Sequence, residues 1–327
     1  MLNKHKVLRS SRMLILVVTG ALLGVMTVPA YAAASMVKTS APGYYRIMLG
    51  DFEVTTISDG TFAAPVAKLM TNTTPAVVNQ GLKRAFLSNP INMSINAYLI
   101  NTGSKLVLID AGLGTFDRGY GPGAGHLLAN LKAAGYRPEQ IDEIYVTHFH
   151  PDHVGGLVTD GKMTFPNAIV RADRHEAAEW LNEANAKRAP NDFRFGEATA
   201  ALTPYIQAGH FQPFEGATQL IPGIRSVPAP GHTEGHTVYR VDSSGQTMLI
   251  CGDIIHLPAV QFDNPSIAIA FDNDSKEAIV SRRRIFDEAA ERGYLVGTAH
   301  VSFPGIGHLR KAGKGYVWVP VDYLPMY

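Results

Sequence analysis

The residues best suited to chemistry lie in segment 147–153, which reads THFHPDH. Three histidines and one carboxylate fall within the six residues from His148 to His153, directly after the apolar segment 144–146. Neutral imidazoles and carboxylates are the ligands that a borderline metal ion such as zinc prefers. Packing alone does not explain four such groups, because burying each without a partner would cost desolvation energy. The segment predicts a metal site; chance histidines in a solvated loop are the alternative.

Further candidate ligands follow in three later segments. His232 lies in a Gly/Pro-rich turn, Asp253 follows the apolar segment 248–251, and His300 ends a short strand-like segment that begins at Leu295. Each lies at or just past the end of an expected strand, where loops on a rigid sheet carry chemistry. With His148, His150, Asp152 and His153 they make seven ligands. Seven are too many for one tetrahedral ion and suit two ions that share a bridging ligand.

This His-x-His-x-Asp-His run with its downstream ligands resembles the metallo-β-lactamase-fold hydrolases. Segments 40–46, 101–110 and 302–308 extend the resemblance to the methyl parathion hydrolase branch, over nearly the whole mature chain. The metal motif is specific for the fold, whereas the branch-level match narrows the substrate. One departure is segment 112–123, which is longer and richer in glycine than the loop of that branch. We expect this segment to lie over the site.

The resemblance also implies a role for each ligand. One ion is assigned His148, His150 and His232, and the other Asp152, His153 and His300. Asp253 bridges the two ions and is a catalytic candidate for delivering a proton to the leaving group, with water as the alternative. This bridging carboxylate argues against a true β-lactamase, because those enzymes lack it. We expect zinc, with cobalt, manganese or iron as alternatives. The resemblance also implies a homodimer.

The ligand set predicts metal-dependent hydrolysis. Two divalent ions that share a water lower its pKa towards ~7, so hydroxide exists at neutral pH. That bridging hydroxide is expected to attack a carbonyl carbon or a phosphorus atom while the ions polarise the attacked oxygen and stabilise the leaving one. No serine or cysteine nucleophile is required. The single cysteine, Cys251, is therefore interpreted as a buried, inert thiol.

Aromatic residues predict an apolar substrate pocket. The resemblance places Trp180 and Phe271 around the leaving group, and further candidates lie in segments that can close over the site or face the cavity. These further candidates are Phe116, Tyr120, Phe193, Phe195 and His256. An uncharged aromatic rim suits a small, neutral, hydrophobic ester, lactone or phosphotriester, whereas a glutathione thioester or a nucleotide needs basic anchors. The alternative is that these aromatic residues belong only to the core.

Three functional hypotheses remain open. The first is a hydrolase of lactones and aryl esters with an overlapping phosphotriesterase activity, and the second is a dedicated organophosphate triesterase. The third is a catalytically inactive metal-binding protein. The complete ligand set argues against the third hypothesis. Because carbonyl and phosphoryl substrates need the same hydroxide and the same oxygen polarisation, we favour one enzyme with both activities.

The chain's length and patterning predict one hydrolase domain over residues 33–327. The 327 residues are 46% hydrophobic and 17% charged, as in ordinary globular proteins, and no linker divides them. Strands are expected over 52–58, 97–100, 106–109, 168–170, 238–241 and 248–251, and helices over 126–134, 173–184, 197–208 and 275–292. The resemblance implies how these α/β (α+β) elements are arranged: an αββα sandwich with the metals at one edge.

The first 32 residues read as a secretory signal peptide. Four basic residues precede an apolar stretch from Met13 to Val28, and Ala30-Tyr31-Ala32 forms a small-x-small cleavage site. A retained membrane anchor is the alternative. Removing four positive charges from the formal net charge of +1 leaves about −3 for the mature chain. We therefore expect a periplasmic or secreted enzyme that binds neither nucleic acid nor, after cleavage, a membrane.

Overall fold

The computed structural model describes residues 34–116, 119–189 and 191–323. The chain divides into two compact units, Met1–Thr39 and Ser40–Tyr327, and every helix and strand below belongs to the second. The expected signal peptide, residues 1–32, lies outside the described residues. Among those described, no helix combines the length and the apolar character that crossing a bilayer requires.

Six strands form the first sheet, in the order β1-β2-β4-β5-β6-β9. They are β1 (Tyr44–Leu49), β2 (Phe52–Ala64), β4 (Ile91–Asn101), β5 (Leu106–Ile109), β6 (Glu143–Tyr145) and β9 (Ile169–Arg171). The first four strands pair antiparallel, and β5, β6 and β9 run parallel. Strand β5 reads LVLI and is buried along its whole length. Such a continuous apolar run fits a strand that is covered on both faces.

Seven strands form the second sheet, in the order β10-β11-β12-β13-β15-β16-β17. They are β10 (Gln219–Ile221), β11 (Ile224–Pro228), β12 (Thr237–Ser243), β13 (Gln246–Ile250), β15 (Leu295–Gly297), β16 (Ile306–Ala312) and β17 (Gly315–Pro320). Strands β12 and β13 form a hairpin, and β13 pairs in parallel with β15. Two small ribbons, β14 (Ala268–Ile269) with β3 (Met70–Thr71) and β7 (Val158–Thr159) with β8 (Lys162–Met163), lie outside both sheets.

The helices have the bounds α1 (Val66–Leu69), α2 (Pro75–Arg84), α3 (Leu127–Ala133), α4 (Pro151–Val154), α5 (Arg174–Trp180), α6 (Glu183–Arg188), α7 (Phe193–Gln207), α8 (Pro258–Gln261) and α9 (Ser275–Arg292). Short 3-10 turns are η1 (Pro138–Gln140), η2 (Gly155–Leu157) and η3 (Gly252–Ile254). The expected helix over 173–184 is two helices, because α5 ends at Trp180 and the Asn182 side chain caps a new one. Helix α9 ends at Gly293, whose left-handed φ of 68° suits glycine.

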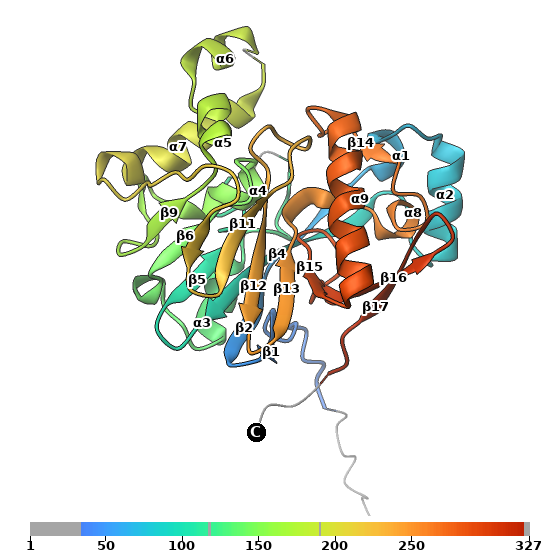
Figure 1. Cartoon of the computed structure of the whole chain (residues 1–327), viewed down its shortest axis with the longest axis horizontal. Coiled ribbons are helices and arrows are strands. Elements are labelled where there is room, and N and C mark those ends of the chain that lie inside the picture. Colours follow the sequence, from blue (N-terminus) through green and yellow to red (C-terminus); the bar gives the residue numbers. More distant parts are fainter. Residues whose placement is uncertain (1–33, 117–118, 190, 324–327) are drawn as a thin grey trace, which may run out of the picture. The chain divides into compact units, whose positions relative to one another are not determined.

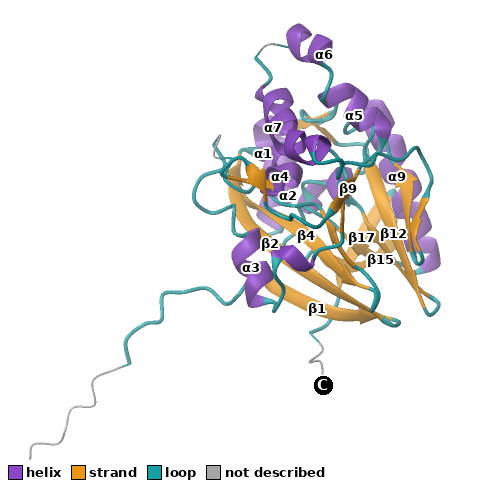
Figure 2. Ribbon diagram, turned by 90° about the vertical axis from the view of Figure 1, so that its left-hand side faces the viewer, coloured by secondary structure: helices purple, strands orange, loops and turns teal. Residues whose placement is uncertain are grey.

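The two sheets stack between outer helices, which confirms the expected αββα sandwich (Figures 1 and 2). Alternate residues of β5 separate two cores: Val107 and Ile109 belong to the core between the sheets, whereas Leu106 and Leu108 belong to the outer core that includes residues of α3 and α7. Helix α9 packs against the second sheet, and its Ile285 is buried among apolar residues of that sheet. Burying each sheet on both faces fixes the positions of the strand ends.

Candidate metal centre and adjoining cavity

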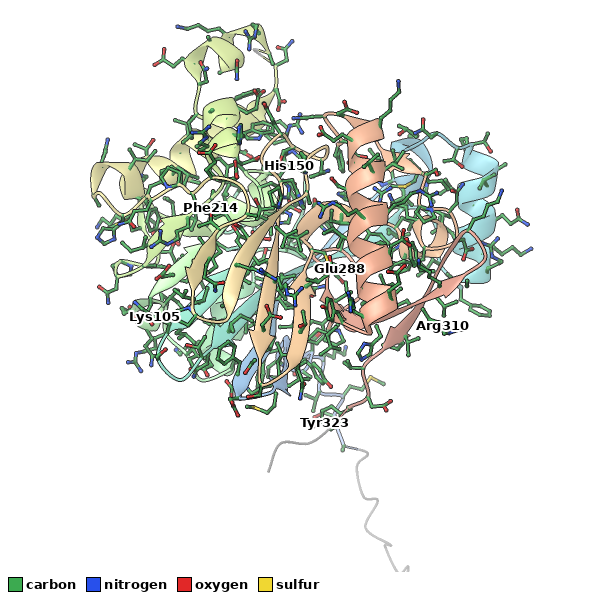
Figure 3. All side chains as sticks on the ribbon, in the orientation of Figure 1. Lys105, His150, Phe214, Glu288, Arg310 and Tyr323 are labelled. Atoms are coloured by element: carbon green, nitrogen blue, oxygen red, sulfur yellow. The ribbon has the colours of Figure 1, made fainter. Side chains whose placement is uncertain are left out.

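The structure brings all seven expected ligands together at one edge of the sandwich. Their donor atoms fall into groups whose members lie within 4.8 Å of one another, and every member is buried. The groups are His148 with His150, His232 and Asp253; Asp152 with His153 and His300; and Asp253 with His256 and His300. Figure 3 labels His150 at this edge, below the helices α5 and α6. Asp253 and His300 occur in overlapping groups, as expected of a cluster for more than one ion.

Strand ends place these side chains. The first four ligands follow β6, Asp253 follows β13, His300 follows β15, and His232 lies in the β11–β12 loop. Because β13 and β15 run parallel, their carboxyl ends reach the same edge. In the chain between β13 and Asp253, Gly252 has a φ of +51°, and a Cβ there would come within 2.8 Å of His236 Nε2. A glycine is therefore needed to turn the chain into Asp253.

Asp253 lies at the centre of the cluster with 3% of its surface exposed. Its Oδ1 is 3.1 Å from His153 Nε2 and 3.2 Å from His300 Nε2, and its Oδ2 is 3.2 Å from His232 Nε2. Burial raises the pKa of Asp253, but His300 and His153 outweigh burial and hold this pKa well below its usual range. An ionised carboxylate with histidines on both oxygens is the geometry that a bridging ligand needs.

The outer nitrogens of four ligand histidines face oxygen atoms. Nδ1 of His148 meets Thr147 Oγ1 at 3.1 Å, Nδ1 of His153 meets Asp110 Oδ2 at 2.8 Å, Nδ1 of His232 meets Asp272 Oδ1 at 2.9 Å, and Nδ1 of His300 meets Ser94 O at 2.7 Å. Such partners turn Nε2 inward, as they do around bound metals. Among the described residues, the buried Nε2 atoms of His148 and His153 make no well-aligned hydrogen bond, although that of His153 lies 3.1 Å from Asp253 Oδ1. The donor set therefore fits metal ions.

His150 differs from the other four histidines. Its Nδ1 faces His232 Nε2 at 3.1 Å, and its Nε2 meets a cation, Arg194 Nη1, at 2.9 Å. Asp192 holds the Arg194 guanidinium with a 2.6 Å ion pair, and the guanidinium lies 5.1 Å from the Trp180 ring. Sequence reasoning missed Arg194. Its position in a helix that carries the aromatic candidates Phe193 and Phe195 was the available signal.

The buried histidines differ in pKa because their charged neighbours differ. Burial lowers the pKa of His232, but Asp253 and Asp272 outweigh burial and raise this pKa to about 9. Burial lowers the pKa of His256 to about 4 despite Asp253, and lowers the pKa of His236 to about 3. His236 accepts the backbone N–H of Asp253 at 3.1 Å, so it orients the bridging residue. The sequence did not predict a role for Asp272, because no candidate metal ligand lies in its loop.

Two further buried carboxylates, Asp110 and Asp59, lie near the cluster. Asp110 bonds His153 and also accepts the backbone N–H and the hydroxyl of Thr147. Asp59 has a different role: its carboxylate accepts the backbone N–H groups of Leu113, Gly125 and Leu127. It therefore anchors the glycine-rich segment rather than a ligand.

A cavity of about 450 Å³ opens onto the cluster. Four of the seven expected pocket residues line it: Tyr120, Phe193, His256 and Phe271. The other three lie elsewhere: Trp180 and Phe195 are buried in the outer core, and Phe116 packs against that core beside a second hollow. Helical spacing explains the difference, because α7 turns Phe195 inward while Phe193 stays 42% exposed.

The rest of the cavity wall is mostly apolar. Phe62, Pro65, Leu69 and Met93 are among its further lining residues, and none of them carried a sequence signal. Arg194 is the one arginine or lysine among the described lining residues. The rim is therefore aromatic, as expected, but it includes one cation that is paired with a carboxylate.

Comparisons with known proteins agree with this geometry. The family model of the metallo-beta-lactamase superfamily matches residues 91–297. A probable metallo-hydrolase of Mycobacterium tuberculosis is 28% identical over 200 residues, which is 55% of this chain and 61% of that protein. An N-acyl homoserine lactonase of Bacillus cereus is 25% identical over 179 residues, covering 49% of this chain and 64% of the lactonase. The chain thus spans about three fifths of the length of these curated relatives.

Two solved structures resemble the model over most of its length. The hydrolase AbOPH of the beta lactamase superfamily has a TM-score of 0.82 and 35% identity, and the match covers 88% of this chain and 100% of that one. AidC, a dizinc quorum-quenching lactonase in complex with a product, N-hexanoyl-L-homoserine, has a TM-score of 0.78 and 27% identity, covering 86% and 99%. Both matches extend well beyond the ligand-bearing loops.

Proposed function

This chain belongs to the metallo-beta-lactamase superfamily, and we propose that it is a metal-dependent hydrolase whose substrates are neutral, hydrophobic lactones and aryl esters, with phosphotriesters as an overlapping activity. One observation carries the proposal: the apolar cavity of about 450 Å³ ends on the seven clustered ligands. The dizinc lactonase AidC supports the lactone part. The resemblance to the methyl parathion hydrolase branch supports the phosphotriester part.

Two ions are proposed, most readily zinc, with cobalt, manganese or iron as alternatives. His148, His150 and His232 would hold one, Asp152, His153 and His300 the other, and Asp253 would bridge them. Divalent ions bound there would supply hydroxide from water at neutral pH and polarise the oxygen under attack. The chain's own contribution is to orient the ligand nitrogens and to keep Asp253 ionised.

Tyr120 is the polar group of the wall best placed to act on substrate. Its hydroxyl donates to Asp152 Oδ1 at 3.3 Å and lines the cavity. Burial raises the pKa of Tyr120 well above its ordinary value, and Asp152 raises it further, so the hydroxyl stays protonated at neutral pH. Because it has one proton, the hydroxyl would turn from Asp152 to donate a hydrogen bond to an oxygen that gains charge during hydrolysis.

The proposal is tested with purified, metal-loaded protein and a panel of substrates. The panel compares kcat/KM for acyl-homoserine lactones and aryl lactones with that for a methyl phosphotriester bearing a nitrophenol leaving group. Comparable values, or a lead for lactones, support the proposal. A large lead for the phosphotriester would make the chain a dedicated organophosphate triesterase. Turnover that survives complete chelation would overturn the metal-dependent mechanism itself.

A further inference from the structure

Glu176 is a buried carboxylate that the ligand set does not use. It lies on α5 with 0% of its surface exposed. Its Oε1 accepts the backbone N–H of Phe149 at 2.7 Å. Its Oε2 accepts the Thr233 hydroxyl at 2.6 Å and the backbone N–H of Gly235 at 3.1 Å. The partners come from two loops that are more than 80 residues apart in sequence.

Those two loops carry all three histidine ligands of one proposed ion, and the first loop also carries Asp152 and His153 of the other. Phe149 stands between His148 and His150, and Thr233 follows His232 directly. The ligand histidines of the second ion depend on other groups, since His153 is bonded to Asp110 and His300 to the Ser94 carbonyl. One carboxylate therefore bonds to both loops that hold the histidines of the first ion, whereas the histidines of the second ion bond to separate partners.

Packing shows how closely the second loop rests on α5. A Cβ at Gly235 would lie 2.2 Å from the backbone nitrogen of Glu176 and 2.6 Å from its Cβ. Only a residue without a side chain allows the loop to approach the helix this closely. The first loop is fixed at its other side by Phe149, whose ring is fully buried in the outer core.

Burying a carboxylate is costly, and the partners of Glu176 are two N–H groups and one hydroxyl rather than a cation. Desolvation raises the pKa of Glu176 to about 7, against the lowering effect of Thr233 and Phe149. An apolar side chain of similar volume would fill the site at lower cost but would leave those donors unpaired. Its hydrogen bonds, rather than its contribution to packing, therefore account for a carboxylate at this position.

We propose that Glu176 is a positioning residue that sets the spacing of His148 and His150 relative to His232, and so selectively supports the first metal ion. The inference rests on the proposed dinuclear site. It predicts that losing the carboxylate weakens one ion far more than the other. A residue that merely stabilised the fold would weaken both ions alike.

The test measures metal affinity by competition with a chromophoric chelator in two backgrounds. In His300→Ala the remaining ion depends on His148, His150 and His232; in His232→Ala it depends on the other group. Adding Glu176→Gln should weaken zinc binding about 10–100-fold in the first background, as loss of a group that orients ligands does. In the second background the affinity should stay within about twofold, the scatter of independent sites.

A second readout avoids metal altogether. In metal-free protein, hydrogen exchange of segments 147–150 and 231–236 should be faster in Glu176→Gln than in wild type, because one amide oxygen cannot accept from both the Phe149 and the Gly235 N–H and so no longer ties the two segments together. Glu53→Gln is the control: this half-buried carboxylate accepts from Tyr136 Oη at 2.6 Å and pairs with Arg46 Nε at 3.2 Å, and none of these residues lies in or next to a ligand loop. It should leave exchange in those two segments unchanged.

Three outcomes would overturn the inference. Equal weakening in both backgrounds, together with a lower melting temperature of the metal-free protein, would assign Glu176 to the fold alone. Unchanged affinity in both backgrounds with unchanged exchange would remove the role of the carboxylate. If wild-type protein bound no metal, the proposed function would fail as well. That last failure is recognised before any Glu176 variant is compared.

Discussion

The ligand cluster and the cavity wall differ in how firmly they are built. Every ligand is buried and extends from a strand end or a tight turn next to it, and the outer nitrogens of four of the five histidines meet partners from other segments, while that of His148 meets the adjacent Thr147. The wall draws on strands β2 and β4 and helix α1, but Tyr120, Phe193 and Phe271 come from loops and from the first turn of α7, and the aromatic wall residues are half-buried or exposed, with Phe193 at 42%. The sheets fix the ligands, whereas this loop-borne part of the wall can change without disturbing them.

The sharpest test of the cluster removes its central carboxylate. Asp253→Ala should lower metal content towards one ion or none per chain and reduce kcat/KM at least ~1,000-fold, since several kcal/mol of charge stabilisation are lost. Metal analysis and steady-state kinetics measure both effects. Asp263→Ala, which removes an exposed carboxylate paired with Arg84 at 2.6 Å, is the control and should change neither. Two tightly held ions in Asp253→Ala would rule out the bridging role.

The wall depends on a different carboxylate, Asp59, which holds the glycine-rich segment through three backbone N–H groups. Burial raises the pKa of Asp59 to about 6 from 3.8, against those hydrogen bonds. The folded state then holds a proton that the unfolded state releases. The contribution of Asp59 to the free energy of unfolding should therefore fall by about 3 kcal/mol as pH rises from about 4 to above 6.

Denaturant unfolding of metal-free protein across this pH range, compared with Asp59→Asn, measures that contribution. The asparagine does not titrate, so the difference between the two proteins should shrink or change sign with rising pH. If the three N–H donors instead held the folded-state pKa at or below that of the unfolded chain, wild type would lose no stability relative to the variant over this range. That result would mean that an ionised carboxylate holds the wall throughout the range.

The same contrast explains what the sequence could predict. The clustering of the seven candidate ligands and the strands before them were predictable, because metal chemistry demands particular residue types and apolar runs mark buried strands. Asp272 and Glu176 were not, because a carboxylate that orients a ligand carries no motif and is recognised only once the loops meet. The face of α7 on which each side chain lies determines that Phe193, and not Phe195, reaches the cavity. The composition of the segment does not reveal which face points to the cavity.

Asp272 tests whether the cluster depends on partners outside the ligand set. Asp272→Asn keeps the shape but weakens the hydrogen bond to His232 Nδ1, which is 2.9 Å long. Zinc affinity should fall about 10–100-fold, because this partner fixes the ring and raises its basicity. Chelator competition measures the change, and Asp242→Asn, a carboxylate that pairs with Arg240, is the control. Equal affinities in wild type and Asp272→Asn would show that strand geometry alone orients His232.

The smallest expected effect concerns the wall. Tyr120→Phe removes the hydroxyl that donates to Asp152 at 3.3 Å and keeps the ring, whose centroid lies 4.9 Å from that of Phe62. Metal content should stay at the wild-type value, while kcat/KM for an alkyl lactone falls about tenfold, the value of one hydrogen bond to a developing charge. Tyr136→Phe is the matched control, because that hydroxyl donates to Glu53 Oε1 at 2.6 Å away from the cavity. A nitrophenyl ester should respond less than the lactone, because its leaving group needs less help in accepting charge. An equal loss for both substrates would place the hydroxyl in substrate binding, and a loss of metal would place Tyr120 with the cluster rather than the wall.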